Sequence, residues 1–256
     1  MCEHLNIFGL ELPMYGMMIL LGIIVANAVA LFLCKKFNAD KLELLTLESY
    51  GIIGAFIGSK ILFLIIGFKE IDWGRIGEIK YLINVMTNGF VFYGGLIGAV
   101  LFIFLGSKIH NIDVWFYLRK FIFMIPIMHC FGRIGCFCAG CCYGRPYEGF
   151  GAVEFPYGSQ ALPGEKLFPV QLVEAGLVLI VAIVLLILII KKDFFYTVET
   201  YLLSYSVIRF ALEFLRYDAV RGEAFGLSTS QWISIVIFIG TIISIIYRKK
   251  RNKKIK

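Results

Sequence analysis

The segment that indicates the fold class most clearly runs from Leu177 to Ile190 and reads LVLIVAIVLLILII. It is apolar on every side of a helix, whereas a strand of a membrane barrel alternates apolar and polar positions over about ten residues. A helix of roughly 20 apolar residues, rising ~1.5 Å per residue, crosses a hydrocarbon layer about 30 Å thick. This stretch therefore predicts a helix that spans a membrane.

Comparable apolar stretches recur along the whole chain. The 256 residues are 59% hydrophobic, which is more apolar surface than a soluble core of this size can bury, so lipid must cover the rest. The sequence predicts an all-α membrane protein, with residues 1–256 forming a single transmembrane domain. About seven spanning helices are expected, at approximately 12–34, 48–68, 89–106, 118–136, 170–190, 197–215 and 227–247.

The distribution of basic residues predicts the orientation, because short loops rich in Lys and Arg stay in the cytoplasm. One set of predicted loops, which includes the tail, carries fifteen basic residues and the other set carries seven. The N-terminus is therefore expected outside and the C-terminus in the cytoplasm. The basic tail at 248–256 suits anionic lipid headgroups, and no nucleic-acid partner is expected.

Two segments outside the helices complete the predicted organisation. Residues 1–11 contain no Lys or Arg, so the first apolar helix lacks the basic start of a cleavable signal peptide and is expected to be retained. Residues 137–169, between the fourth and fifth helices, are rich in Gly, Pro and aromatic residues. They predict a small extracytoplasmic cap.

Ionisable residues inside the predicted spans each need a partner or a purpose, because burying one costs on the order of 2.5–3.5 kcal/mol. A structural role would pair Lys60 with Glu48 or Glu174. An ion pair along one helix would join Arg209 to Glu213, four residues later. The ionisable residues in question are Lys60, Arg133, Glu174, Arg209 and Glu213.

Three arginines are harder to explain by packing. Arg133, Arg209 and Arg216 all fall in the outward half of their predicted helices. Guanidinium groups donate two parallel hydrogen bonds to phosphate oxygens, so several of them at headgroup depth indicate a phospholipid headgroup site.

At this point several motifs, taken in order, resemble those of the prolipoprotein diacylglyceryl transferase family. The central signature is GRIGCF at 132–137, followed by GRP at 144–146. The resemblance covers about residues 10–245. The other segments are MYG at 14–16, NG at 88–89, YGGLIG at 93–98, FPVQLVEA at 168–175, Tyr205 with RFALEFLR at 209–216, and Gly226 with Ser230 and Gln231.

The resemblance implies a multi-pass enzyme of the bacterial plasma membrane that works among membrane lipids. Such enzymes move the diacylglyceryl group of phosphatidylglycerol to the lipobox cysteine thiol in a prolipoprotein signal peptide, forming a thioether and releasing glycerol phosphate. Arg133 and Arg209 match the two central arginines of the family, which would stabilise the departing phosphate. Tyr93 stands at the position of the family's base. The resemblance implies neither a cofactor nor a metal.

Further residues match positions that would contact the substrate. The tyrosines, Gln171 and Glu213 would bind headgroup hydroxyls or hold the arginines in place. Three glycines among these residues lie in the motifs YGGLIG at 93–98 and GRP at 144–146. The residues that the resemblance assigns to substrate binding are Tyr15, Gln171, Tyr205, Glu213, Gly94, Gly95 and Gly144.

Three positions depart from the family pattern. Tyr93 stands where the family commonly has His, Cys136 stands in place of Asn, and Cys141 replaces an acidic residue. A His, with an ordinary pKa near ~6.5, can take a proton from a thiol at neutral pH, whereas a phenol near ~10 is a poor base. Either the base lies elsewhere or Tyr93 orients the substrate. These departures leave open the same donor chemistry with another thiol or hydroxyl as acceptor.

The cysteines form a pattern of their own. Five of the seven are Cys130, Cys136, Cys138, Cys141 and Cys142, whereas Cys2 and Cys34 are scattered. They can be small buried fillers, a disulfide, a soft-metal site, or a thiolate activated by a nearby arginine. A non-enzymatic thiol or metal sensor, or a transporter, is the alternative function. His129 is expected to pack or hydrogen-bond within its own helix.

Overall fold

The computed structural model describes residues 4–7, 10–156, 159, 161–217 and 223–254. Helices dominate these residues and the three sheets have two short strands each, so the predicted all-α class is confirmed. Cys2, Arg221 and the end of the tail, residues 255–256, lie outside the described part of the chain. Two compact units can be distinguished. Unit 1 comprises Met1–Leu33 and Leu118–Lys256, and unit 2 comprises Cys34–Tyr117.

Unit 2 is built on two long helices whose ends are defined by local chemistry. The side chain of Asp40 caps the first of them, since its Oδ1 accepts hydrogen bonds from the backbone N–H groups of Leu42 (2.6 Å) and Glu43 (3.2 Å). Asn111, in the left-handed conformation, ends the other. The elements are α2 (Lys41–Ile66), η1 (Trp73–Arg75), α3 (Ile79–Thr87) and α4 (Phe92–His110).

Glycines allow α2 and α4 to pack with their backbones in contact. A Cβ atom on Gly58 would overlap the carbonyl oxygen of Gly94, and one on Gly98 would overlap that of Gly54. Each helix thus carries two glycines spaced four apart, the small-residue spacing by which membrane helices approach closely. Gly94 is therefore required for helix packing, whatever its role toward a substrate.

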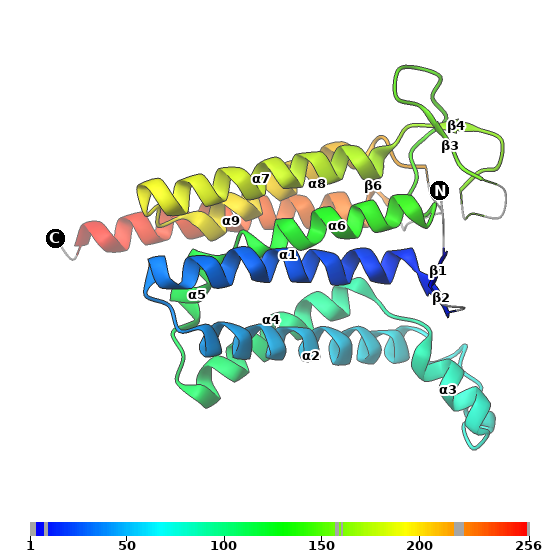
Figure 1. The fold of residues 1–256 in the computed structure, drawn as a ribbon, viewed down its shortest axis with the longest axis horizontal. Coiled ribbons are helices and arrows are strands. Elements are labelled where there is room, and N and C mark those ends of the chain that lie inside the picture. The colour runs from blue at the N-terminus through cyan, green and yellow to red at the C-terminus, as the bar shows by residue number, and fades with distance from the viewer. Residues whose placement is uncertain (1–3, 8–9, 157–158, 160, 218–222, 255–256) are drawn as a thin grey trace. The chain divides into compact units, whose positions relative to one another are not determined.

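Unit 1 contains the remaining long helices, of which α6 packs on α7, α7 on α8, and α8 on α9 (Figure 1). Most of α1 also belongs to it, and a Cβ on Gly22 in that helix would lie 2.8 Å from the Cβ of Phe131 in α6. The helices are α1 (Met14–Phe37), α6 (Met124–Cys138), α7 (Val170–Lys192), α8 (Thr197–Glu213) and α9 (Thr229–Lys254). The boundary between the units divides α5 (Val114–Phe121) after Tyr117. Three antiparallel hairpins join β1 (His4–Ile7) to β2 (Leu10–Pro13), β3 (Val153–Glu154) to β4 (Lys166–Leu167), and β5 (Glu223–Ala224) to β6 (Leu227–Ser228).

Within the described chain, α1, α2, α4, α7 and α9 are long and apolar enough to cross a membrane. The span predicted at 118–136 is divided between α5 and α6, which meet at a bend of 53° and would count as a sixth span. Pro126 explains the break, because its ring would clash with the carbonyl of residue 122 in a continuous helix. The span predicted at 197–215 corresponds to α8, which has 17 residues. The multi-pass architecture is confirmed, whereas the count of seven and the orientation remain predictions.

The cap predicted at 137–169 has a small core of its own. Phe155, Ala161 and Leu167 are buried together, and Phe137 packs against them. Strand β3 pairs with β4, and Pro146 forms a further bridge to Leu167. This segment lies at one end of unit 1, opposite the last turns of α9 (Figure 1). Which end faces the cytoplasm, and the division of the chain into one domain, a cap and a tail, stay predictions.

Candidate active site

A buried carboxylate on α7 forms the centre of the site in unit 1. Glu174 is 1% exposed, and its Oε1 lies 3.0 Å from Nη2 of Arg133 and 3.4 Å from Nε2 of His129, both on α6. The hydroxyl of Tyr205, on α8, donates to the same oxygen at 3.5 Å. Because an unpaired charge at this depth would be strongly unfavourable, Glu174 holds Arg133 inside the helical bundle.

The second arginine approaches Glu174 from α8. Nη1 of Arg209 lies 3.9 Å from Oε2 of Glu174, and Nη2 of Arg209 lies 2.5 Å from Oε2 of Glu213. Nη2 also donates to the hydroxyl of Ser230 on α9, at 3.1 Å. The predicted pair between Arg209 and Glu213 is confirmed. Arg133 and Arg209 therefore meet at one carboxylate, although they are far apart in the sequence.

Apart from Oε2 of Glu213, which is ion-paired with Arg209, two buried polar atoms of this site have no hydrogen-bond partner among the described residues. They are Nη1 of Arg209, a donor, and Oε1 of Gln171, an acceptor. Leaving such an atom unpaired costs about 1–3 kcal/mol, more for a charged group, so each calls for a partner in the working state. An unpaired cationic donor and an unpaired amide acceptor would suit a ligand that carries both an anionic group and a hydroxyl.

Gln171 and Tyr15 border the turn that follows α6. The Gln171 side chain is fully buried, and its Nε2 donates to the carbonyl oxygen of Cys141 at 2.8 Å. The backbone of Gly135 leaves room for Tyr15, since a Cβ there would lie 3.1 Å from its ring. Arg133 acts electrostatically on the Tyr15 hydroxyl. The structure thus brings Tyr205 and Glu213 into the arginine network, places Tyr15 within electrostatic reach of Arg133, and places Gln171 against the turn after α6. Their roles toward a substrate stay predictions.

Gly144 has a structural role in the cap. It pairs with Arg216 in an antiparallel bridge, and a Cβ at Gly144 would overlap the carbonyl oxygen of Phe168. The neighbouring N–H of Arg145 donates to the carbonyl oxygen of Leu215 at 2.9 Å. Only glycine allows the cap, the start of α7 and the end of α8 to come this close. Contact between Gly144 and a substrate remains a prediction.

The other predicted site residues, Tyr93, Gly94 and Gly95, belong to unit 2 and open α4. The ring of Tyr93 makes an edge contact with Phe92, with ring centres 5.6 Å apart. A Cβ on Gly95 would lie 3.2 Å from the carbonyl oxygen of Ala55, which is a packing contact between α4 and α2. The catalytic role of Tyr93 and the binding roles of the two glycines remain predictions.

Lys60 uses backbone carbonyls as partners. Its ammonium group donates to the carbonyl oxygens of Asn88 (2.7 Å), Gly89 (3.3 Å) and Val85, all within unit 2. Three acceptors match the three donors of a lysine. Lys60 thus attaches the loop after α3 to α2, which is the structural role that the sequence left open, with carbonyls in place of a carboxylate.

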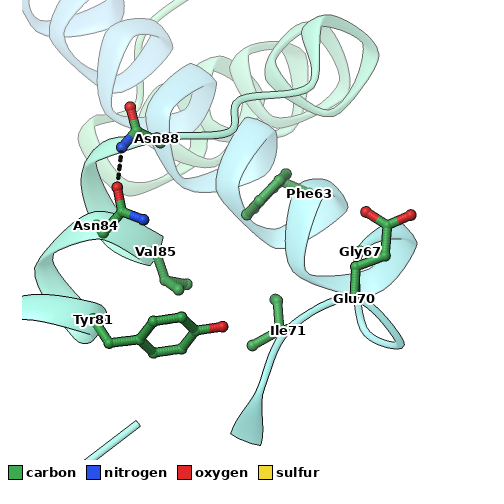
Figure 2. A pocket seen from close by; sticks show the side chains of 8 residues that line it. All are labelled: Phe63, Gly67, Glu70, Ile71, Tyr81, Asn84, Val85 and Asn88. Carbon is green, nitrogen blue, oxygen red and sulfur yellow. Dashed lines mark hydrogen bonds between the residues drawn. The ribbon is translucent and has the colours of Figure 1, made fainter. Parts of the chain in front are cut away.

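A pocket lies between the end of α2, the following loop and α3 (Figure 2). Its polar contacts are internal, since Asn88 donates to the side-chain oxygen of Asn84 at 2.5 Å and the Tyr81 hydroxyl accepts from the N–H of Asp72 at 2.8 Å. The pocket is lined by Phe63, Gly67, Glu70, Ile71, Tyr81, Asn84, Val85 and Asn88.

Three residues of the arginine site were not among the predicted site residues: Glu174, His129 and Ser230. The signal for Glu174 was present, because a carboxylate in the apolar helix 170–190 requires a cationic partner. His129 forms the expected contact within its helix, as Nε of Arg133 lies 3.3 Å from its Nε2, and it also reaches Glu174 and the ring of Tyr205. Ser230 lies in one of the segments that carry the family resemblance, but no site role was predicted for it.

Comparison with known proteins identifies relatives along the whole chain. A family model described as prolipoprotein diacylglyceryl transferase matches residues 3–247, which confirms the resemblance drawn from the motifs. The chain is 37% identical to phosphatidylglycerol–prolipoprotein diacylglyceryl transferase 2 of Clostridium perfringens, over 97% of this chain and 96% of that protein. It is 34% identical to the enzyme of the same name from Clostridium tetani (96% and 98% covered) and 33% identical to that of Pasteurella multocida (94% and 89%).

Proposed function

Because the chain belongs to the prolipoprotein diacylglyceryl transferase family, we propose that it transfers the diacylglyceryl group of phosphatidylglycerol to the lipobox cysteine of prolipoproteins in the bacterial plasma membrane. One structural observation carries the proposal. Arg133 and Arg209 converge on Glu174 inside the bundle, and Nη1 of Arg209 remains buried without a hydrogen-bond partner among the described residues.

The chemistry requires a cation at the donor's phosphate. The bond between the glyceryl carbon and the phosphate oxygen breaks, the acceptor sulfur forms a thioether at that carbon, and the thiol proton is transferred to a base. Charge develops on the phosphate as the bond breaks, and preorganised guanidinium groups stabilise it. Glu174 and Glu213 keep the arginines in position before the lipid binds, so little reorganisation is needed.

The headgroup of phosphatidylglycerol carries hydrogen-bonding groups that could pair with the two unpaired atoms of the site, Nη1 of Arg209 and Oε1 of Gln171. Its phosphate can accept from the free Nη1 of Arg209, and its glycerol hydroxyls can donate to Oε1 of Gln171. Tyr205 and Tyr15 would orient the headgroup. For Tyr93, Gly94 and Gly95 the family resemblance alone supports the proposal, with Tyr93 as base or as an orienting group and the two glycines in substrate binding.

The test uses the purified full-length protein, phosphatidylglycerol labelled in both its backbone glycerol and its headgroup glycerol, and a lipobox peptide. We expect a thioether-linked peptide and an equal amount of glycerol phosphate. A peptide with Ser in place of the lipobox Cys, and phosphatidylethanolamine in place of the donor, serve as controls. Glycerol phosphate released without modified peptide would point to another acceptor. Intact phosphatidylglycerol after incubation with monodisperse protein would refute the proposal.

A further inference from the structure

The turn after α6 gathers three thiols that the arginine site does not use. The sulfur atoms of Cys136, Cys141 and Cys142 all lie within 4.8 Å of one another. A cation bound to three thiolates at about 2.3 Å holds the sulfurs about 3.8 Å apart, so small side-chain movements would complete such a site. We propose that Cys136, Cys141 and Cys142 bind one thiophilic d10 cation of the Zn²⁺ class.

The backbone fixes this cluster. Cys142 has φ +59° and Gly140 has φ +64°, so a side-chain-bearing residue accepts the left-handed conformation within a reversal of the chain. The N–H of Cys141 donates to the carbonyl oxygen of Cys136 at 3.1 Å, and its thiol lies 3.7 Å from the same oxygen. The buried amide of Gln171 holds the Cys141 carbonyl from α7. The turn itself and α7 therefore both hold the backbone that carries the three sulfurs.

Two arginines act electrostatically on this cluster. Three thiolates and a divalent cation carry one net negative charge, and a nearby positive charge offsets it. Arg133 and Arg216 both act electrostatically on Cys142. Three protein ligands also leave one tetrahedral position for solvent or for an external thiol.

Simple packing does not explain the cluster. Cys130 shows what a packing cysteine looks like here, because it is buried in an apolar cluster with Ala175 and Val178. Cys141 and Cys142 are instead partly exposed and face other sulfurs. A disulfide would use only two of the three thiols and leave the third without a reason to be there.

The experiment measures metal binding by the full-length protein itself, so its result does not depend on the proposed transferase activity. Protein purified under reducing, anaerobic conditions is equilibrated with Zn²⁺ against a competing chelator, and bound zinc is determined by elemental analysis. Cd²⁺, bound in place of Zn²⁺, reports thiolate ligation by its charge-transfer absorption. We expect one metal ion per chain.

The matched variants are single Cys→Ser changes in the same segment. Cys136→Ser, Cys141→Ser and Cys142→Ser should each weaken binding by about 10²-fold or more, since even outer-shell partners of metals contribute 10–100-fold. Cys138→Ser, which removes a thiol outside the cluster, should bind like the wild type. Zn²⁺ should raise the Tm of the wild type and of Cys138→Ser, and leave that of Cys142→Ser unchanged.

Three outcomes would overturn the proposal. The reduced wild-type protein could bind no metal, or the three variants could retain it as well as Cys138→Ser does. The third is a disulfide between two of the three cysteines in protein whose free thiols were alkylated in intact membranes. Size-exclusion chromatography and circular dichroism identify a variant that fails to fold. Metal binding by the remaining single variants then tests the proposal.

Discussion

At the scale of single residues, the site depends on a few charges that neutralise one another inside the bundle. Glu174 pairs with two arginines and a histidine, and Glu213 pairs with one of the same arginines. Breaking a buried pair by removing one partner leaves the other charge uncompensated. Substitutions that keep the shape but remove the charge should therefore separate structural from catalytic roles.

Arg133→Gln should lower the transfer rate by about 10²-fold or more, as removing one preorganised donor does in other enzymes. The measurement is the turnover of labelled phosphatidylglycerol by inserted, monodisperse protein. Arg75→Gln is the matched control, because Arg75 is exposed and pairs only locally, with Glu78. Full activity in a well-folded Arg133→Gln protein would remove Arg133 from the mechanism.

Glu174→Gln should destabilise the protein by about 3–5 kcal/mol, since two buried guanidinium groups lose their shared carboxylate. Denaturant unfolding in detergent measures the change. Glu78→Gln, on an exposed pair in unit 2, should stay within about 0.5 kcal/mol of the wild type. Equal stability of the two variants would show that Glu174 is not the centre of the network.

Tyr93→His tests the position that departs from the family pattern. If Tyr93 occupies the base position, a histidine there should keep or raise transfer to a thiol and move the pH optimum downward, because imidazole accepts a proton near neutral pH. Tyr93→Phe separates orientation from proton transfer. An inactive Tyr93→His protein beside a fully active Tyr93→Phe protein would mean that this side chain only packs.

At the scale of elements, glycines set how closely α2 and α4 approach. Gly98→Ala should destabilise unit 2 by about 1–3 kcal/mol, because its Cβ would overlap the carbonyl oxygen of Gly54. Gly240→Ala in α9 is the matched control, since a Cβ there meets nothing within 4 Å. Thermal unfolding in detergent should therefore show a lower Tm for Gly98→Ala alone. An unchanged Tm would indicate that the two helices do not pack through these glycines.

At the scale of the whole molecule, chemical labelling can determine on which side of the membrane the cap and the basic tail lie. Phe150→Cys, in the cap, should react with a membrane-impermeant maleimide in intact cells, as residue 150 is fully exposed. Lys250→Cys, in the basic tail, should react only after the membrane is opened. Both are compared with the unsubstituted protein, which reports labelling of the native cysteines. Labelling of Lys250→Cys in intact cells would invert the predicted orientation.

The fold class, the family and the positions of the two central arginines could all be predicted from the amino-acid sequence. Apolar runs such as 177–190 depend on local composition, and the motifs around Arg133 and Arg209 are short and contiguous, so both can be read without knowing which segments meet. The bend between α5 and α6 was harder to predict from the sequence, because the apolar run continues through residues 118–136 while Pro126 interrupts the helical backbone.

Which of these side chains contact one another could be learned only from the three-dimensional structure. The convergence of Arg133, Arg209 and Tyr205 on Glu174 joins three helices. The grouping of Cys136 with Cys141 and Cys142, but not Cys138, depends on a turn with two left-handed residues. Contacts of this kind arise from side-chain direction and helix rotation, which hydrophobic periodicity leaves undetermined when a helix is apolar all around.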